Sequence, residues 1–308
     1  MFAFGPLAWR KKNNAIILFY SFLPTLISLL IIYLIFYFFL PSQVEEPVEI
    51  YHDVTYKSRT FYFPSHNLTI ATIWAPFLVK YETNKSNKEL QVYLDILEEK
   101  WTTSYHKYDY IVIATGQWYT KSFVAWEQGK ITGCHNCEEG YKEIQLEYPY
   151  RKALEMAFSF ITSSDHKPFV FFRTWASSHF EYGEWFSGGI CNRTRPYKEG
   201  EYAEKLFDQL MRNIEVEEFE KMVGAAEGRG VRMELLDTFH LSSLRPDGHP
   251  GPYRKYHPFD EDKNARVQND CLHSCLPGPI DTWNDLIMKK LQNAGAVEPS
   301  ESERKISM

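Results

Sequence analysis

The sequence contains little cysteine, glycine or proline for its length, and it has no excess of positive charge. Its 308 residues include 5 Cys, 16 Gly and 16 Pro, which excludes a small disulfide scaffold, a collagen-like chain and a disordered chain. The 34 Lys and Arg residues face 40 Asp and Glu residues, and this balance argues against a general nucleic-acid-binding protein. The sequence also lacks a P-loop, a GxGxxG motif and a repeat of fixed period.

One long apolar run is present. Residues 15–40 contain no charged side chain, and roughly 20 apolar residues suffice to cross a membrane. Basic residues precede the run at Arg10, Lys11 and Lys12, whereas acidic residues follow it. The positive-inside rule therefore predicts a single-pass type II signal anchor with residues 1–14 as a cytoplasmic tail and the rest in a lumen. A cleaved signal peptide is the alternative, but its apolar region would be only ~7–15 residues long.

The expected domain plan follows from this anchor. We expect a linker over residues 41–60, one large domain over residues 61–294 and a disordered tail over residues 295–308. Three glycosylation sequons, at Asn67, Asn84 and Asn192, suit a lumenal location.

The five cysteines are disulfide candidates in an oxidising lumen, and their odd number leaves at least one without a partner inside the chain. They are Cys134, Cys137, Cys191, Cys271 and Cys275. The Cys134-His-Asn-Cys137 motif could also be half of a zinc site. Because no second pair follows at a suitable spacing, we favour a disulfide and expect no metal.

Alternating strand and helix patterns predict an open α/β sheet. The predicted strands cover residues 67–75, 108–116, 168–174 and 231–236, and the predicted helices cover residues 150–162, 201–223 and 280–292. Residues 117–142 show no regular pattern. Functional groups of such sheets gather beyond the carboxyl ends of the strands, where this sequence has Gly116, Gln117, Trp118 and Arg173.

Asp270 and His273 form the sharpest local motif. Residues three apart share a face of a helical turn, so the carboxylate can orient the imidazole as a general base. This arrangement is two thirds of an acyl-transfer triad, and its missing member is a nucleophilic Ser, Cys or Thr.

Several stretches occur together in a family-specific order. They are Trp74–Val79, Gly116–Trp118, Phe172–Thr174, Gly188–Asn192, Leu236–Asp237, Leu244–Pro250, Asp270–His273 and Asp281–Asn284. In these stretches the chain resembles the plant trichome-birefringence-like family of polysaccharide O-acetyltransferases, most of all its xyloglucan O-acetyltransferase branch. The resemblance implies a three-layer αβα sandwich of the SGNH/GDSL type, with Asp270 and His273 as catalytic residues. By the same resemblance, Gly116 and the residue after it, Gln117, would lie where SGNH-like enzymes place their oxyanion donors. Trp118 and Arg173 would line the glycan groove, and all four are candidate substrate-binding residues.

The resemblance also implies the partners and the location. An acetyl group would pass from a donor, for which acetyl-CoA is one candidate, through a serine to a hydroxyl of xyloglucan or a related hemicellulose. No cofactor would be bound, and no nucleic acid would take part. The protein would be a glycoprotein of the Golgi membrane with its C-terminal domain in the lumen.

The sequence departs from the family in one central feature, because it contains no Gly-Asp-Ser nucleophile motif. Two smaller departures are Ser274, where the family commonly has Trp, and Gln117, where it often has His. In this fold the nucleophile follows the first, interior strand, so we expect that strand to be missing and the sandwich to be incomplete. We consider Ser42 unsuitable as a replacement, because it lacks the Gly-Asp context and adjoins the predicted membrane segment. A truncated product, or a catalytically inactive relative that binds glycan or a partner, is the alternative to an active enzyme.

Several residues have a plain structural interpretation beside the functional one. Arg173 could be an ion-pair partner inside the fold, and His249 could fix a loop. The tryptophans Trp118, Trp175 and Trp185 could be core residues or sugar-stacking platforms.

Overall fold

The computed structural model describes residues 14–20, 46–137 and 140–295, and a seven-stranded sheet forms its centre. The strand order is β11-β10-β7-β1-β4-β3-β2. Five strands run parallel: β1 (Asn14–Tyr20), β4 (Leu68–Ile73), β7 (Tyr110–Ala114), β10 (Phe169–Arg173) and β11 (Arg232–Leu236). Two antiparallel strands, β3 (Arg59–Phe63) and β2 (Val48–His52), form one edge. Every residue of β10 is buried, as expected for a parallel strand covered on both faces.

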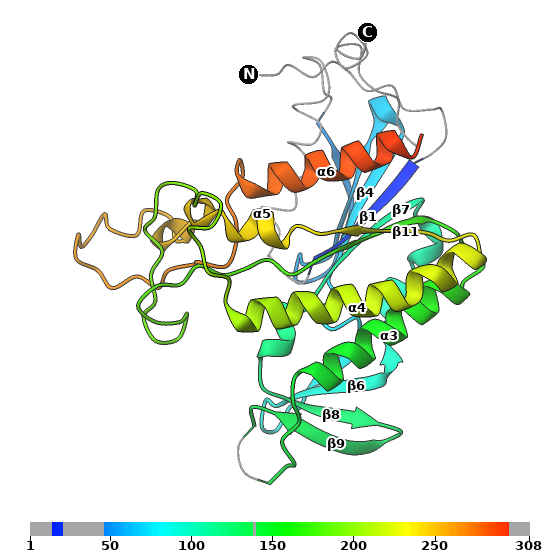
Figure 1. The fold of residues 1–308 in the computed structure, drawn as a ribbon, viewed down its shortest axis with the longest axis horizontal. Helices are drawn as coiled ribbons and strands as arrows, with labels where there is room; N and C mark the ends of the chain where they lie inside the picture. The colour runs from blue at the N-terminus through cyan, green and yellow to red at the C-terminus, as the bar shows by residue number, and fades with distance from the viewer. Residues whose placement is uncertain (1–13, 21–45, 138–139, 296–308) are drawn as a thin grey trace.

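Helices cover both faces of this sheet, so the described part of the chain is a mixed α/β fold. Figure 1 shows α3 (Glu147–Ser163) and α4 (Leu206–Gly228) on one face and α6 (Pro279–Asn293) on the other. The α3 face that carries Ala153, Leu154, Ala157, Phe158 and Ile161 is buried against the sheet and α4. The shorter helices are α2 (Glu99–Thr102) and α5 (Phe239–Ser243), with 3₁₀ turns at Pro64–His66, Tyr105–Lys107, Gln117–Thr120, Pro246–Gly248 and Pro252–Arg254.

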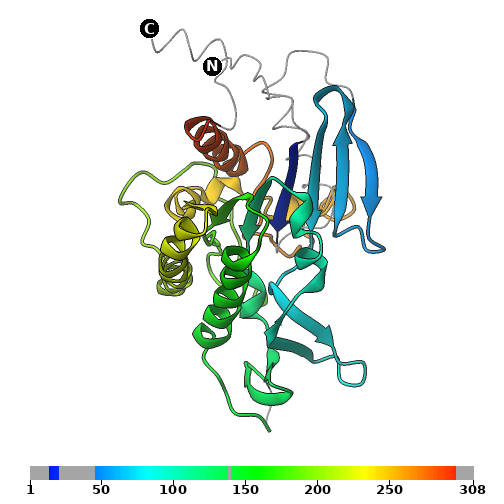
Figure 2. The same cartoon turned by 90° about the vertical axis from the view of Figure 1, so that its right-hand side faces the viewer.

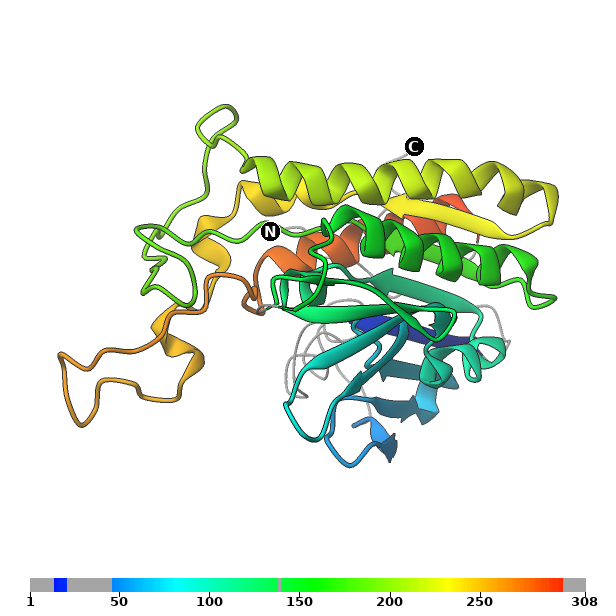
Figure 3. The ribbon, with the colours of Figure 1, turned by 90° about the horizontal axis from the view of Figure 1, so that it is seen from below.

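A smaller sheet lies beside α3, separate from the large one (Figure 2). Its order is β5 (Val79–Thr83), β6 (Leu90–Leu97), β8 (Phe123–Glu127) and β9 (Lys130–His135). Two long loops, over residues 174–205 and 244–278, project together from one end of the molecule (Figure 3). We call them the loop lobe.

The interior of the sheet differs from the expectation of a missing strand. β1 pairs with β4 on one side and with β7 on the other, so Asn14–Tyr20 occupies the interior position. The predicted membrane helix over residues 15–40 is therefore wrong for Ala15–Tyr20, and residues 21–40 lie outside the described part. A short apolar run is compatible with a helix and with a buried parallel strand, and here tertiary pairing selects the strand. Among the described residues, no helix has the length and apolar character needed to span a bilayer.

Two further expectations differ from the structure. The predicted linker over residues 41–60 is wrong for Val48–His52, because this segment is β2 and pairs with β3. The irregular stretch predicted over residues 117–142 contains the hairpin of β8 and β9, whose residues Phe123, Val124 and Ala125 are buried. The expected disordered tail over residues 295–308 lies outside the described residues except for Gly295.

Candidate functional site

The parallel strands end at one common edge of the large sheet. Tyr20 and Arg173 both lie opposite Ala114, and Arg173 also lies opposite Leu236. The segments that follow β7, β10 and β11 therefore emerge side by side, which is where ligands bind in open α/β sheets. The loop lobe continues from β10 and β11 at this edge.

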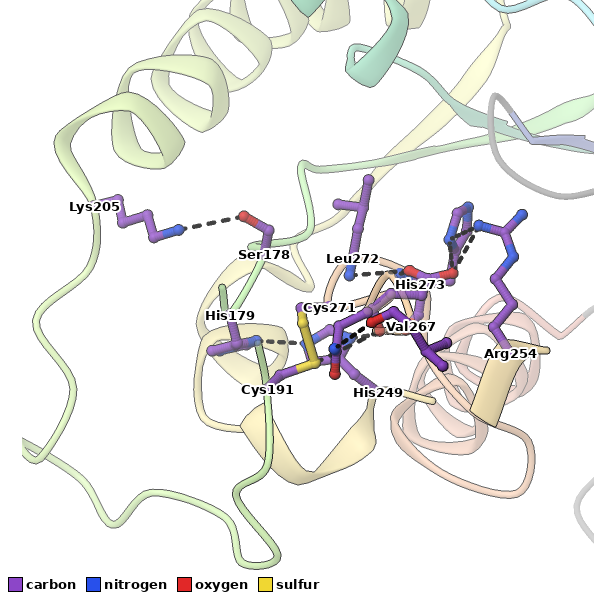
Figure 4. Close-up of a disulfide and its surroundings, with 12 residues drawn as sticks. Ser178, His179, Cys191, Lys205, His249, Arg254, Val267, Cys271, Leu272 and His273 are labelled. Atoms are coloured by element: carbon purple, nitrogen blue, oxygen red, sulfur yellow. Dashed lines mark hydrogen bonds and ion pairs between the residues drawn. A yellow bond between two sulfur atoms is a disulfide. The ribbon is translucent and has the colours of Figure 1, made fainter. Parts of the chain in front are cut away.

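Asp270 and His273 meet within the loop lobe, and we call this pair the dyad. Asp270 Oδ2 lies 2.6 Å from His273 Nδ1, and the Asp270 Oδ1 atom accepts a hydrogen bond of 3.0 Å from the His273 backbone N–H. Arg254 donates a hydrogen bond of 2.8 Å to Asp270 Oδ2 (Figure 4). Because a carboxylate can only accept, the His273 Nδ1 atom carries the proton and Nε2 is the basic nitrogen.

The electrostatics of the dyad favour an ionised aspartate. Asp270 is 6% exposed, and burial alone would raise the pKa of its carboxyl. The hydrogen bonds and positive charge of His273, together with the charge of Arg254, outweigh burial and lower the pKa to about 2. The carboxylate therefore stays charged and stabilises the imidazolium that a general base forms when it accepts a proton.

Covalent and backbone links hold the dyad in place. A disulfide joins Cys191 to Cys271, the residue directly after Asp270. The His179 backbone N–H donates to the Cys271 carbonyl at 2.9 Å, and Gly251 and Asp270 exchange two backbone hydrogen bonds of 3.1 and 2.9 Å. The segment from residue 270 to residue 273 is therefore clamped by both halves of the loop lobe.

Two histidines, His249 and His179, extend the chain of polar contacts that begins at the dyad. His249 Nδ1 lies 2.7 Å from the His273 carbonyl, and His249 Nε2 lies 2.7 Å from His179 Nδ1 (Figure 4). On the other side of its ring, His179 Nε2 lies 2.8 Å from the Ser243 carbonyl. Both outer nitrogens must donate, because carbonyl oxygens only accept. A hydrogen bond between the inner nitrogens then needs a third proton, but two neutral rings carry only two.

The protonation state of His179 and His249 decides which of the three hydrogen bonds can form at the same time. Burial lowers the pKa of His179 to about 4 and also lowers the pKa of His249. The pair is thus neutral near pH 7 and can satisfy two of its three contacts there, while the third proton arrives only in acid. His249 contacts the backbone carbonyl of His273, which suits the loop-fixing interpretation from the sequence.

The other predicted site residues lie at the edge of the sheet and are largely packed. Gly116 has a φ of +110°, and an added Cβ atom would lie 2.9 Å from the Tyr150 hydroxyl oxygen and 3.1 Å from the Trp175 ring. Gln117 is buried, and Arg173 is 6% exposed, with its guanidinium 4.8 Å from the centre of the Trp283 ring.

Trp118 packs edge-on against Trp74, and Lys121 lies over its ring. Burial favours a structural role for Arg173. That Gly116, Gln117, Trp118 and Arg173 contact substrate stays a prediction.

The structure adds a cluster of buried carboxyl groups that the sequence reasoning missed. Glu215 of α4 is fully buried and accepts hydrogen bonds of 2.5 Å from the Tyr150 hydroxyl and from the Trp175 backbone N–H. Two turns earlier on the helix, Asp208 accepts from the Trp175 indole N–H at 2.8 Å. At the start of the same helix, the apolar side chain of Leu206 is 84% exposed. The spacing of Asp208, Glu215 and Glu218 on one helix face was the available signal.

The cysteines and sequons are placed as follows. Cys134 is bonded to Cys137, and Cys275 has no disulfide partner within the described part of the chain. Among the described residues there is no cluster of three or more His, Cys, Asp or Glu side chains suited to a metal ion. Asn67 and Asn192 are exposed, and Asn84 is partly exposed.

The structure does not assign a nucleophile. Residues 21–45, which follow β1 in the sequence, lie outside the described residues. Cys275 is close to the dyad in sequence, but burial raises the pKa of its thiol, and the charge of Asp270 raises it further. A reactive cysteine needs a lowered thiol pKa, so Cys275 is poorly suited to the role.

Comparison with known proteins identifies the family. Residues 38–290 match the PC-Esterase family model, described as a GDSL/SGNH-like acyl-esterase family found in Pmr5 and Cas1p. The chain is 51% identical over 255 residues to protein trichome birefringence-like 26 of Arabidopsis thaliana, covering 82% of this chain and 57% of that protein.

A second relative carries an activity in its name. The chain is 40% identical over 254 residues to xyloglucan O-acetyltransferase 1 of Arabidopsis thaliana, covering 82% of this chain and 59% of that protein. The chain thus spans about three fifths of the length of the curated relatives it matches. It belongs to the trichome birefringence-like branch of the PC-Esterase family.

Proposed function

We propose that this chain transfers acetyl groups to hydroxyls of a cell-wall polysaccharide, with xyloglucan as the first substrate to test. The observation that carries the proposal is the 2.6 Å contact between Asp270 Oδ2 and His273 Nδ1, which leaves Nε2 as the basic nitrogen. The SGNH type of αβα sandwich is part of the proposal, and the strand edge with its loop lobe suits it. The names of the xyloglucan O-acetyltransferase relatives support the choice of substrate.

The chemistry divides into two balanced steps. In the first, His273 Nε2 takes the proton of a serine hydroxyl, the serine oxygen bonds to the acetyl carbon of the donor, and the leaving group departs with that proton. In the second, His273 takes a proton from the sugar hydroxyl, whose oxygen attacks the acetyl-enzyme, and the serine regains its proton. Acetyl-CoA is the donor to test first. The printed sequence has no Gly-Asp-Ser motif, so the serine must be found by experiment.

The proposed location is the Golgi lumen. The Cys191–Cys271 disulfide and the surface positions of Asn67, Asn84 and Asn192 support an oxidising, glycosylating compartment. A membrane helix that includes Ala15–Tyr20 is not part of the proposal, because these residues belong to the sheet. A shift of the protein on a gel after treatment with an endoglycosidase would test the glycosylation.

The decisive experiment uses the full chain expressed in a secretory host. Purified protein is incubated with acetyl-CoA and xyloglucan oligosaccharides, and the products are analysed by mass spectrometry. We expect acetylated oligosaccharide from the natural chain and none above background from His273→Ala. Absence of transfer by the natural chain, or transfer that survives His273→Ala, would sink the proposal. A fluorophosphonate probe followed by peptide mapping would show which serine reacts.

A catalytically inactive glycan-binding relative is the second candidate function, and the missing Gly-Asp-Ser motif is the observation that favours it. It predicts oligosaccharide binding by the natural chain without acetyl transfer and without labelling of any serine by the probe.

A further inference from the structure

Glu181–Ile190 forms a tight hairpin in the first loop of the loop lobe. The backbone groups of Glu181 and Ile190 exchange hydrogen bonds of 2.8 and 2.9 Å, and Gly189 N–H donates to the Glu184 carbonyl at 2.9 Å. A Cβ atom on Gly189 would lie 2.4 Å from the Gly183 carbonyl oxygen, so the two strands of the hairpin approach too closely for any other residue. The hairpin therefore has a defined backbone shape.

The tip of this hairpin presents three aromatic side chains to solvent. Tyr182 is 88% exposed, Trp185 is 61% exposed and Phe186 is 73% exposed. The Trp185 and Phe186 rings stand edge to face with their centres 5.5 Å apart. Large apolar side chains that are grouped and exposed on an ordered turn mark a binding surface, because leaving them in water gives up the free energy of burial. We call these three residues the aromatic tip.

The aromatic tip is tied to the dyad at two points. Cys191, the residue directly after the hairpin, is disulfide-bonded to Cys271, which lies within the segment that carries the dyad. Gln268, two residues before the dyad, donates a hydrogen bond of 2.9 Å to the Trp185 carbonyl. Trp185 is six residues from Cys191, so the tip lies within ~20 Å of the disulfide along extended chain. This span corresponds to a few sugar units.

The acidic side chains of the hairpin are paired with basic residues from neighbouring parts of the chain. Arg193 Nε lies 2.6 Å from a Glu181 carboxylate oxygen, and Lys205 Nζ lies 3.9 Å from a Glu184 carboxylate oxygen. An anionic lipid, a phosphate or a nucleic acid would be met by an excess of positive charge, which this surface does not have. An uncharged ligand with flat apolar faces suits it, and the C–H faces of sugar rings have this character.

We propose that the aromatic tip is a binding subsite for an uncharged polysaccharide chain, whose sugar rings stack on Trp185, Phe186 and Tyr182. The hairpin would hold the acceptor chain a few sugar units away from the hydroxyl that reaches the dyad. This inference rests on the proposed function, because it names the surface that binds the acceptor of that reaction. It separates the three tryptophans singled out in the sequence: Trp175 is a buried core residue, Trp118 is packed, and Trp185 is the sugar platform.

Calorimetric titration of the full chain with xyloglucan oligosaccharides tests the inference. We expect Trp185→Ala to weaken binding at least about tenfold, roughly 1.4 kcal/mol, and the double variant with Phe186→Ala to weaken it further. Trp185→Tyr, which keeps a ring, should restore most of the affinity. Tyr51→Ala is the matched control, because Tyr51 is 56% exposed on β2 at the far edge of the sheet. Unchanged thermal unfolding shows that the variants are folded.

The outcomes separate this inference from the proposed function. Weakened binding in the tip variants supports the subsite even if the natural chain transfers no acetyl group. Equal affinity of the tip variants and the natural chain, or no binding by either, overturns the subsite even if transfer proceeds. Binding to phosphatidylcholine vesicles that depends on the aromatic tip, in place of binding to glycan, would also overturn it.

Discussion

Two buried carboxyl groups in this molecule have pKa values that are shifted in opposite directions. Glu215, under α4, is fully buried, and burial raises the pKa of its carboxyl to about 8. Asp270, in the loop lobe, is almost as buried, yet the pKa of its carboxyl falls to about 2. Neutral donors, the Tyr150 hydroxyl and the Trp175 N–H, contact Glu215, whereas His273 and Arg254 bring positive charge to Asp270. Burial is the largest influence on the pKa of Glu215, and the nearby charge of Arg173 offsets only part of it, whereas His273 and Arg254 outweigh burial at Asp270.

The difference teaches which carboxyl can serve catalysis. Asp270 is charged at neutral pH and can stabilise an imidazolium, while Glu215 is protonated and acts as a hydrogen-bonding node for the segment after β10. Both hold loops at the same end of the sheet, but Asp270 contacts His273, the proposed general base, whereas Glu215 contacts Tyr150 and Trp175.

The first prediction has the largest expected effect. Two matched amide substitutions compare the importance of Asp270 and Glu215 for catalysis. Asp270→Asn removes the charge and favours the wrong tautomer of His273, so we expect acetyl transfer to fall by ~10³–10⁴-fold. Glu215→Gln replaces a protonated carboxyl by an amide of the same shape, so the turnover number should change by only a few fold. Turnover numbers on the xyloglucan acceptor compare the two. Equal losses in both variants would contradict the division.

The second prediction compares how much two disulfides stabilise the protein, one in the loop lobe and the other at the small sheet. Replacing Cys191 and Cys271 by Ser opens a link that spans 80 residues, and we expect unfolding to become easier by about 2–5 kcal/mol. The same change at Cys134 and Cys137 opens a link of only 3 residues and should cost clearly less. Urea unfolding curves of both double variants give the comparison. A larger loss from the short link would argue against the loop lobe as the part that depends on its cross-link.

The sequence predicts the sheet better than the loop lobe for a physical reason. Strands β4, β7 and β10 are short, largely apolar runs, and their composition reflects their burial. The run at Asn14–Tyr20 has the same composition, but its continuation to residue 40 favoured a membrane helix. Only pairing with β4 and β7, which lie far away in sequence, shows it to be a strand.

The candidate site was predicted in part for a related reason. The three-residue spacing of Asp270 and His273 is local, so it can be read from the sequence. The contacts of Glu215 with Tyr150 and Trp175 join residues 65 and 40 positions apart, and hydropathy patterns assign a glutamate to the surface. The link from His249 to His179 spans 70 positions and is equally invisible in the sequence.

The third prediction uses the opposite pKa shifts of Glu215 and Asp270, because each shift makes the stability of the protein depend on pH in a different range. Folded Glu215 keeps its proton up to about pH 8, whereas the unfolded chain loses it near 4.5, so its contribution declines as the pH rises through this window. Folded Asp270 loses its proton near pH 2 against 3.8 unfolded, so its contribution is present above 3.8 and is lost as the pH falls toward 2.

Thermal unfolding of the natural chain and the two amide variants across this range is the measurement. Glu215→Gln should remove part of the decline between pH 4.5 and 8, and Asp270→Asn should remove part of the loss in acid. Parallel curves for Glu215→Gln and the natural chain would show that Glu215 is ionised in the folded state.

The smallest expected effect concerns His249 as a positioning residue for the general base. An asparagine amide N–H can take the place of the His249 Nδ1–H, so His249→Asn keeps the hydrogen bond to the His273 carbonyl and loses the contact with His179. A glutamine amide reaches the position of Nε2 instead, so His249→Gln keeps the contact with His179 and loses the carbonyl. We therefore expect His249→Gln to lower the turnover number about tenfold more than His249→Asn, with similar KM values.

A readout that does not depend on activity is the imidazole of His273 itself. If His249 holds the backbone of His273, its loss should loosen the contact between His273 Nδ1 and Asp270. The nitrogen NMR signals of the His273 ring should then move toward those of an exposed histidine in His249→Gln but not in His249→Asn. Identical His273 signals in the two variants, with equal thermal stability, would leave His249 as a purely structural residue. The order of the two variants is decisive, because both remove the same ring and differ only in which end of it they replace.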